Sequence, residues 1–599
     1  MSLDDEAPPR RPRAASLPAE SISRYKLAGS VALPPPDHSL MNPHSSNASR
    51  ATIVMTARER HALTEASIES IVTATRRPYR LMYLDVQSPD WLRETLARRS
   101  AEWGLDVIRF DEPLWPHEVR DRVIDDVDTD YVVFIDNDVL VDEGWLDALV
   151  ACADETGAGI VAPLYLQGDG VHPPTIHMAG GMLVEEAGGN ARHLTDRHLL
   201  SNADPRQVGS QLQRQPCDFA EYHCMLIRTS LVRDHTLLDP NIRCVHEHVD
   251  TALSVKQRGF PVFLEPSSRV TYLAFADYTL DDLRFFRWRW SIAEANANIA
   301  AFSKKWNVID SPRSFGGVRE FVYKHVAQVD PIRLTTSAAA DRATPMRREE
   351  LKQTRSDLLD LAIERGYRAK DLATISSAYH LAHVLMAGGY RPCGRPFVNH
   401  LVGTASVLVR YDFRAETVAA GLLHAAYTHS RPHPDGSDAT VKALAELLGG
   451  EGCPVERAVR AYTRRESDWA RWVAADAGPA SRLLVADAEI LAIAAANEVD
   501  MELSGEVRYS GRTDAIKPEV ARRIAEVCEI LGVSGLAKTL SAVRSMQAGA
   551  PAELMTNMAG SYRVAWAKQN LVPMRSGVQV GALAGSRQDE FERLHRNIG

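Results

Sequence analysis

The stretch YVVFIDNDVLVDEGWL, residues 131–146, decides the fold of the first half of the chain. Its first five residues are apolar or aromatic and run directly into Asp136, Asn137 and Asp138. A short apolar run of this length is typical of a buried strand. Two carboxylates one residue apart after such a strand form either a solvated acidic turn or a metal site at the carboxyl end of the strand.

The surrounding sequence favours an α/β domain. From Thr52 to about residue 305, short apolar runs such as TIVMTA, RLMYLD and LDVIRF alternate with amphipathic stretches such as TEASIESIVTAT. This alternation predicts βαβ units, in which helices cover both faces of a parallel sheet. Ligands of such sheets bind beyond the carboxyl ends of the strands.

Polar residues end three of the predicted strands, and we expect them to line one crevice. Thr56 and Arg58 follow the first strand, Asp85 ends the second, and Asp136 and Asp138 end a later one. An aspartate after the second strand can accept a hydrogen bond from a uracil N–H or a ribose hydroxyl. Two carboxylates spaced i, i+2 can hold Mg²⁺ or Mn²⁺ together with diphosphate oxygens. Such a metal would stabilise the charge on a departing nucleotide diphosphate.

Length and composition restrict the possible functions. A chain of 599 residues is expected to form two or more domains. Its 69 Lys and Arg against 78 Asp and Glu give a net charge of −9, which argues against a nucleic-acid partner. We find no secretory signal and no apolar run of transmembrane length. Seven cysteines without regular spacing indicate reduced thiols in a cytoplasmic protein.

Changes in sequence texture predict five segments. Residues 1–48 are rich in Pro, Ser and charge and should form a disordered tail. Residues 49–305 form the α/β domain, and residues 306–349 form a connector with some helix. Residues 350–548 have helical periodicity almost throughout and predict an all-α domain. Residues 549–599 have weak periodicity and are expected to be a partly mobile extension.

The α/β segment resembles a family 2 glycosyltransferase of the GT-A (Rossmann-like) fold. Six pieces match in order: TIVMTARERHALTEASIESIV, YLDVQSPD, the helix and D-x-D strand that end in YVVFIDNDVLVDEGWLDALV, HMAGGML, CDFAEYHCMLIRTSLV, and VHEHVDTALSVKQRGFPVFLEPSSRV. The resemblance implies a nucleotide-diphosphate sugar donor, an acceptor of unknown identity, assistance by Mn²⁺ or Mg²⁺, and inversion of the anomeric configuration in one displacement.

The same resemblance implies roles for individual donor-site residues. Asp85 would contact the nucleotide base, and Arg120 would contact the donor phosphates. Asp136 would contact the ribose or the metal, and Asp138 would ligate the metal. Members of the family often place a metal-binding His near residue 270, but this chain has Tyr272 there. Metal dependence is still expected, without a complete set of three protein ligands.

The motif EHVD would supply the general base, which is Asp250 or Glu247. We prefer Asp250 at this stage, although Glu247 opens the motif. The family often has Glu-Asp at its start, whereas this chain has Glu247-His248. His248 could serve as a neutral hydrogen-bonding group.

Residues 390–430 resemble the HD-type helical domain of guanosine-tetraphosphate hydrolases. The metal ligands implied by that family are retained at His400, His424 and Asp487. Ala425 replaces the Asp of the His-Asp pair, which removes a carboxylate ligand.

The acidic pair that activates water in this family is also missing, because Thr428-His429 stands in its place. The resemblance therefore implies a retained fold and a lost hydrolase. The retained residues would form either a buried polar network or a His/His/Asp site for a transition metal, with or without His429.

The leading hypothesis is an inverting glycosyltransferase with an HD-like accessory domain. That domain would shape the acceptor site, bind a nucleotide regulator or mediate a homo-oligomer. One alternative is a metal-dependent phosphohydrolase that acts through the helical domain, which Ala425 disfavours. A second alternative is a non-catalytic nucleotide-sugar sensor, which the intact acids of the α/β domain disfavour.

Overall fold

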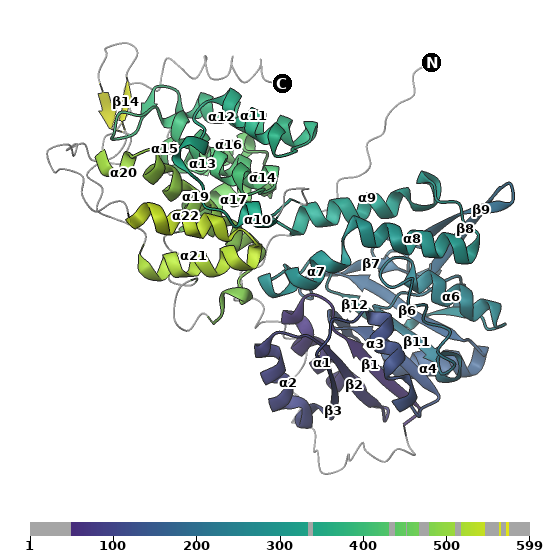
Figure 1. Ribbon diagram of the computed structural model, residues 1–599. Helices are drawn as coiled ribbons and strands as arrows, with labels where there is room; N and C mark the ends of the chain where they lie inside the picture. The colour runs from purple at the N-terminus through teal and green to yellow at the C-terminus, as the bar shows by residue number, and fades with distance from the viewer. Residues whose placement is uncertain are drawn as a thin grey trace. The chain divides into compact units, whose positions relative to one another are not determined.

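The computed structural model divides into two compact units, the first ending at Gln328 and the second beginning at Val329 (Figure 1). The residues it describes are 49–333, 339–430, 438–450, 452–465, 472, 478–509, 517–545, 562–564 and 571–573. The predicted tail, residues 1–48, lies outside the described residues, as does most of the predicted extension. The domain boundaries drawn from the sequence therefore stay predictions.

A 10-stranded sheet forms the first unit, with the order β10-β12-β6-β11-β4-β1-β2-β3, while β5 pairs with β12 and β7 with β6. The strands are β1 Ala51–Thr56, β2 Arg80–Val86, β3 Leu105–Phe110, β4 Tyr131–Asp136, β5 Val139–Val141, β6 Ile160–Gln167, β7 Thr175–Met178, β10 Gln215–Cys217, β11 Cys224–Arg228 and β12 Val262–Tyr272. The four strands from β4 to β3 are parallel, but β11 runs antiparallel between β4 and β6. The expectation of a wholly parallel sheet is thus wrong, because a hairpin and irregular chain, rather than a crossover helix, lead into β11.

Helices surround this sheet, and a two-stranded hairpin extends from it (Figure 1). The helices are α1 Thr64–Ala74, α2 Asp90–Trp103, α3 Pro116–Arg122, α4 Trp145–Thr156, α5 Thr229–Val232, α6 Glu247–Gln257, α7 Leu283–Arg289, α8 Ile292–Trp306 and α9 Pro312–Val329; the hairpin is β8 Gly181–Gly188 with β9 Ala191–His198. Every residue of β1 and β4 is buried, as expected for strands covered on both faces.

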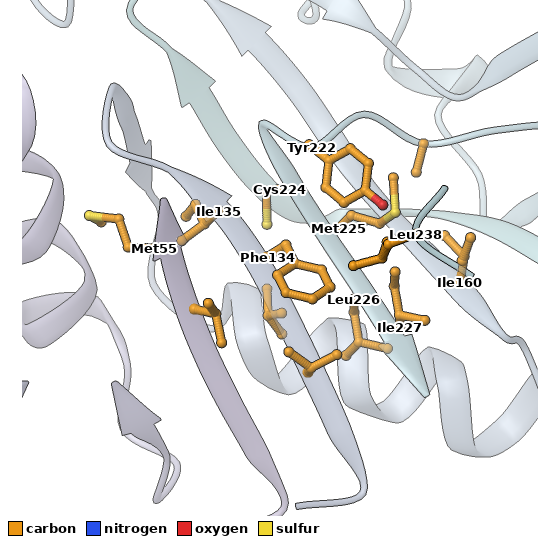
Figure 2. Close-up of a cluster of buried hydrophobic side chains, with 14 of the residues drawn as sticks. Met55, Phe134, Ile135, Ile160, Tyr222, Cys224, Met225, Leu226, Ile227 and Leu238 are labelled. Carbon is orange, nitrogen blue, oxygen red and sulfur yellow. The ribbon is translucent and has the colours of Figure 1, made fainter. Parts of the chain in front are cut away.

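The core of the first unit is continuous across the β4–β11 boundary. Figure 2 shows Phe134 of β4 beside Met225 and Leu226 of β11, and all three side chains are fully buried. Full burial of an apolar side chain of this size contributes about 1.5–3 kcal/mol. The antiparallel pairing of β11 with β4 is therefore held by packing as well as by backbone hydrogen bonds. This pairing fixes which residues at the start of β11 lie opposite the carboxyl end of β4.

The second unit is almost wholly helical, which confirms that part of the prediction. Its helices are α10 Ala339–Arg342, α11 Arg355–Glu364, α12 Ala369–Met386, α13 Phe397–Arg410, α14 Ala415–Leu423, α15 Ala426–His429, α16 Asp438–Leu447, α17 Pro454–Thr463, α19 Val485–Leu503, α20 Glu506–Tyr509, α21 Pro518–Leu531 and α22 Ser534–Ser545. A small sheet joins β13 Gly389–Tyr390, β14 Tyr562–Val564 and β15 Leu571–Pro573. Helix α13 is buried almost all round and packs against α14 and α19.

Two general expectations can be compared with the structure. All seven cysteines are free in the structure. In the part of the chain that is described, each helix is too short or too polar to cross a lipid bilayer.

Candidate donor site

The D-x-D residues lie at the carboxyl end of β4 and are buried, with exposed fractions of 1% for Asp136 and 8% for Asp138. They therefore do not form a solvated acidic turn. One oxygen of Asp136 accepts a hydrogen bond from Arg58, and Arg120 Nη2 lies 3.6 Å from the other. Asp138 Oδ2 accepts a hydrogen bond of 2.9 Å from Arg60 Nη1. Each acid is thus paired with a cation from the loop after β1 or from α3.

Asn137, between the two acids, fixes the loop that follows β1. Its Nδ2 donates to Glu59 O and Thr64 Oγ1, both at 3.0 Å. In this loop Arg60 has φ 56°, in the left-handed region that non-glycine residues rarely occupy. Such conformations cluster at functional sites because the surrounding contacts must hold them.

Four arginines converge on the acids of this site. They are Arg58, Arg60, Arg120 and Arg289. Arg289 is the last residue of α7, and its Nη1 lies 2.9 Å from Glu59 Oε2. Burial, together with the nearby charges of Arg58 and Arg289, lowers the pKa of Arg120 to about 9, although Tyr222 and Glu247 oppose the shift. Sequence reasoning did not single out Arg60, which no motif marks.

Many polar atoms of this cluster are buried without a hydrogen-bond partner. They are Thr56 Oγ1, Arg60 Nε, His117 Nε2, Arg120 Nε and Nη2, Asp136 Oδ1, Asp138 Oδ1 and Arg289 Nε. Native proteins contain few such atoms, and each costs about 1–3 kcal/mol. Their concentration at the carboxyl edge of β1 and β4 indicates a site shaped for a polar ligand. Four of the predicted donor-site residues, Thr56, Arg58, Arg120 and Asp136, meet here, together with Asp138.

A histidine that the sequence did not predict completes a possible metal site. Ligand atoms of Asp136, Asp138 and His223 all lie within 4.8 Å of one another. His223 precedes β11, its Nδ1 lies 3.0 Å from Asp136 Oδ2, and its ring stacks on Tyr272 at 4.0 Å. The unpartnered Oδ1 atoms of the two aspartates and this imidazole nitrogen fit a divalent ion such as Mn²⁺. Tyr272 replaces the histidine expected near residue 270, and its ring supports His223 instead.

Asp85 occupies the end of β2, where the sequence placed it, but its oxygens are already bonded. The carboxylate is fully buried, accepts from Ser88 N at 3.0 Å and accepts from Arg109 Nε at 3.0 Å. The adjacent strand β1 brings it to the same edge of the sheet as Thr56. Its predicted contact with a nucleotide base stays a prediction.

The two acids of EHVD lie in different environments. Asp250 is fully buried and accepts from Trp306 Nε1 at 2.7 Å and from Lys305 Nζ at 3.0 Å. Glu247 begins α6 and interacts electrostatically with His248 and Arg289. Burial opposes ionisation of Glu247, but His248, Arg289, His117 and Arg58 outweigh it and hold the pKa of this carboxyl below its ordinary value.

In the second unit, His400 belongs to a buried network of charged residues. His400 Nδ1 lies 2.7 Å from Asp500 Oδ2, and Arg395 donates to both oxygens of Asp500 at 2.8 Å. Arg391 lies 2.7 Å from Glu506. The acid beside His400 is therefore Asp500, which the sequence did not suggest.

The other two retained residues of the HD-like motif differ in position, because His424 adjoins this network and Asp487 lies far from Asp500. The ring of His424 lies 5.3 Å from that of His400, and its Nδ1 is 2.7 Å from Gly421 O. Asp487 precedes Asp500 by thirteen residues on α19, which places it roughly 20 Å away along the helix axis.

Comparison with known proteins gives the class of the first unit. Residues 52–236 of this unit match the family model for glycosyl transferase family 2. Among solved structures, the "Crystal structure of GalNAc-T7 with UDP, GalNAc and Mn2+" is similar at 14% identity with a TM-score of 0.32. That match covers 47% of this chain and 55% of the other, so it spans little more than half of its relative. A comparison with curated proteins finds no match.

Proposed function

We propose that the first unit transfers a sugar from a nucleotide-diphosphate sugar to an acceptor hydroxyl. The glycosyl transferase family 2 domain supports this class of reaction. The observation that carries the proposal is the group of buried, unpartnered polar atoms at the carboxyl ends of β1 and β4. Their donors match phosphate oxygens and their two acceptors match a divalent cation.

The charges of the site suit a donor that arrives together with a divalent ion. The positive groups of Arg58, Arg60, Arg120 and Arg289 face the negative groups of Glu59, Asp136, Asp138 and Glu247. This cluster is balanced, and an unpaired charge is costly to bury. A nucleotide-diphosphate sugar carries one negative charge on each phosphate, and a divalent cation cancels both. The complex of the two would enter without changing the balance.

We assign the metal to Asp136, Asp138 and His223. The nitrogen ligand makes Mn²⁺ a better fit than Mg²⁺, which prefers oxygen ligands. When bound, the ion would stabilise the charge that builds on the leaving diphosphate. Arg58 and Arg120 would donate to the phosphate oxygens, since Nε and Nη2 of Arg120 have no hydrogen-bond partner and Nη2 lies 3.6 Å from Asp136 Oδ1.

We assign the general base to Glu247 rather than to Asp250. Glu247 begins α6 among the charged groups of the donor site, where its carboxylate could accept the proton of the acceptor hydroxyl, whereas the oxygens of Asp250 already accept from Lys305 and Trp306. Asp250 would position α6 against α8 through Lys305 and Trp306. A single displacement with one base inverts the anomeric configuration and needs no covalent nucleophile.

We further propose that the helical unit is not a phosphohydrolase. Arg395 already satisfies both oxygens of Asp500, and Ala425 is a buried methyl group where a ligand carboxylate would be needed. This arrangement favours the interpretation of His400 as part of a structural polar network.

A donor screen tests the proposed transfer. The Tm of the full chain is measured with UDP-, GDP- and dTDP-sugars, with and without Mn²⁺. In a separate assay, release of nucleoside diphosphate is measured for each donor that raises the Tm. We expect at least one donor to raise the Tm in the presence of Mn²⁺ and to be turned over by wild type but not by Asp138→Ala. Turnover that is equal in the variant, or in excess EDTA, contradicts the metal-assisted mechanism.

A further inference from the structure

A second cluster of metal-ligand side chains adjoins the donor site on the far side of His223. Glu221, two residues before His223, lies close to two histidines from other strands. His177 Nε2 is 2.8 Å from Glu221 Oε2, and His198 Nε2 is 3.5 Å from Glu221 Oε1. His177 belongs to β7, and His198 is the last residue of β9. Three separate segments thus bring two imidazoles to one carboxylate.

The orientation of His177 is fixed by a neighbouring amide. Its Nδ1 lies 3.2 Å from Gln167 Oε1, while Gln167 Nε2 donates to Asn202 Oδ1 at 2.8 Å. The Gln167 oxygen therefore accepts from Nδ1–H, and Nε2 faces Glu221, to which it donates a proton that a bound metal ion would displace. Histidine ligands of metal ions commonly donate their second N–H in this way, because it fixes the tautomer and the ring orientation.

The cluster is also accessible and adjacent to other ligand groups. The side chains of His177, His198 and Glu221 are each partly exposed, so an ion can enter from solvent. The rings of His177 and His198 lie 5.0 Å apart. Ligand atoms of His177, Glu221 and His223 lie within 4.8 Å of one another. His223 Nε2 is 4.0 Å from Glu221 Oε2, so its ring separates this cluster from Asp136.

We propose that His177, His198 and Glu221 form a second metal site, which takes a transition-metal ion of the Zn²⁺ type. Two imidazoles and one carboxylate are a ligand set that Zn²⁺ accepts, with a fourth position open to water or to an oxygen of a bound ligand. The set contains more nitrogen than the Asp136, Asp138 and His223 site, and it therefore favours a softer ion. This site does not depend on the proposed sugar transfer.

Metal binding to the full-length protein tests this second site. Chelator-stripped protein without nucleotide is titrated with Zn²⁺, and bound zinc is measured by equilibrium dialysis and elemental analysis. Co²⁺ serves as a spectroscopic probe through its visible absorption. We expect Glu221→Gln and His177→Ala to weaken Zn²⁺ binding at least ten-fold and to reduce the Co²⁺ band. Asp138→Ala and the control His172→Ala, at an exposed histidine beside Asp169, should retain both.

His198→Ala provides a milder variant, because His198 lies at the end of the hairpin and makes the longer contact with Glu221. Its Zn²⁺ affinity should also fall, and the Tm of each metal-free variant shows whether it is folded. Zn²⁺ binding that is unchanged in all three cluster variants overturns the proposal. Zn²⁺ binding that is lost only in Asp138→Ala overturns it as well, because the ion then belongs to the first site.

Discussion

Each unit buries a cluster of histidine, carboxylate and arginine side chains, yet the two clusters differ in how many of their polar atoms lack a hydrogen-bond partner. In the first unit, Asp136 and Asp138 each keep an oxygen without a hydrogen-bond partner. In the second, both oxygens of Asp500 accept hydrogen bonds from Arg395 and His400 adds a further contact, whereas His400 Nε2 and Glu506 Oε2 lack a hydrogen-bond partner. Burial of charge therefore does not identify a functional site by itself. The two clusters are distinguished by the number of their atoms that lack a hydrogen-bond partner, eight around Asp136 and Asp138 against three around Asp500.

The largest expected effect is the loss of transfer in Asp138→Ala. The substitution removes one of the two carboxylates with a free oxygen, and with it a hard ligand of the proposed cation. Nucleoside diphosphate release with the donor found in the screen should fall to background. The matched change in the other cluster, Asp500→Asn, should leave donor binding intact. Loss of donor binding in both variants would erase the distinction between the clusters.

The next largest effect should be on stability, in Arg395→Ala. Removing the arginine leaves the buried charge of Asp500 uncompensated, which typically costs about 3–5 kcal/mol. A marked fall in the Tm of the second unit is expected by calorimetry. Arg347→Ala is the control, because Arg347 is exposed and its pairing with Glu350 contributes about 0–1 kcal/mol. Equal Tm values for the two variants would show that the network is not structural.

A smaller effect separates the two acids of α6. Glu247→Gln should lower turnover by roughly 10²-fold or more with little change in donor affinity, as expected for a lost general base. Asp250→Asn should mainly lower the Tm, because its carboxylate holds Lys305 and Trp306. Steady-state kinetics and thermal unfolding of both variants check this assignment. The reverse result would restore the sequence-based preference for Asp250.

The smallest effect is expected for Tyr272→Phe. This change keeps the ring that stacks on His223 but removes the hydroxyl that accepts from Arg60 Nη1 at 2.9 Å. One lost hydrogen bond to a charged group contributes about 1.5–3 kcal/mol, so Mn²⁺-dependent donor affinity should weaken by about ten-fold or somewhat more. Tyr272→Ala should weaken it further, because the stacking is also lost. Donor affinities equal to that of wild type in both variants would mean that Tyr272 does not support the metal site.

The sequence predicted the first unit well where local pattern decides structure. The apolar runs before Thr56, Asp85 and Asp136 became strands that end at one edge, because buried parallel strands leave a continuous apolar signal. The same pattern placed both D-x-D acids in the site. His223 was missed because its position depends on the antiparallel register of β11 with β4, which no local pattern encodes.

Long-range contacts explain the other gaps. Arg289 reaches Glu59 from a helix that lies 230 residues later in the sequence. In the helical unit, Asp487 was chosen for its place in a motif, whereas the contact with His400 is made by Asp500, nearly four turns further along α19. The resemblance of this unit to an HD-type domain stays a prediction, and so does its role in assembly.

Calorimetric titration of a nucleoside diphosphate, with and without Mn²⁺, tests the central claim most directly. The claim is that the unpartnered atoms around Asp136 and Asp138 bind a diphosphate and a divalent ion together. Binding of the two should therefore be coupled, with each strengthening the other by the same factor. We predict at least ten-fold tighter binding of UDP, or of the diphosphate matched to the screened donor, with Mn²⁺ in wild type and no such gain in Asp138→Ala. Equal affinity with Mn²⁺ and with EDTA in wild type, or an undiminished gain in the variant, would contradict the account.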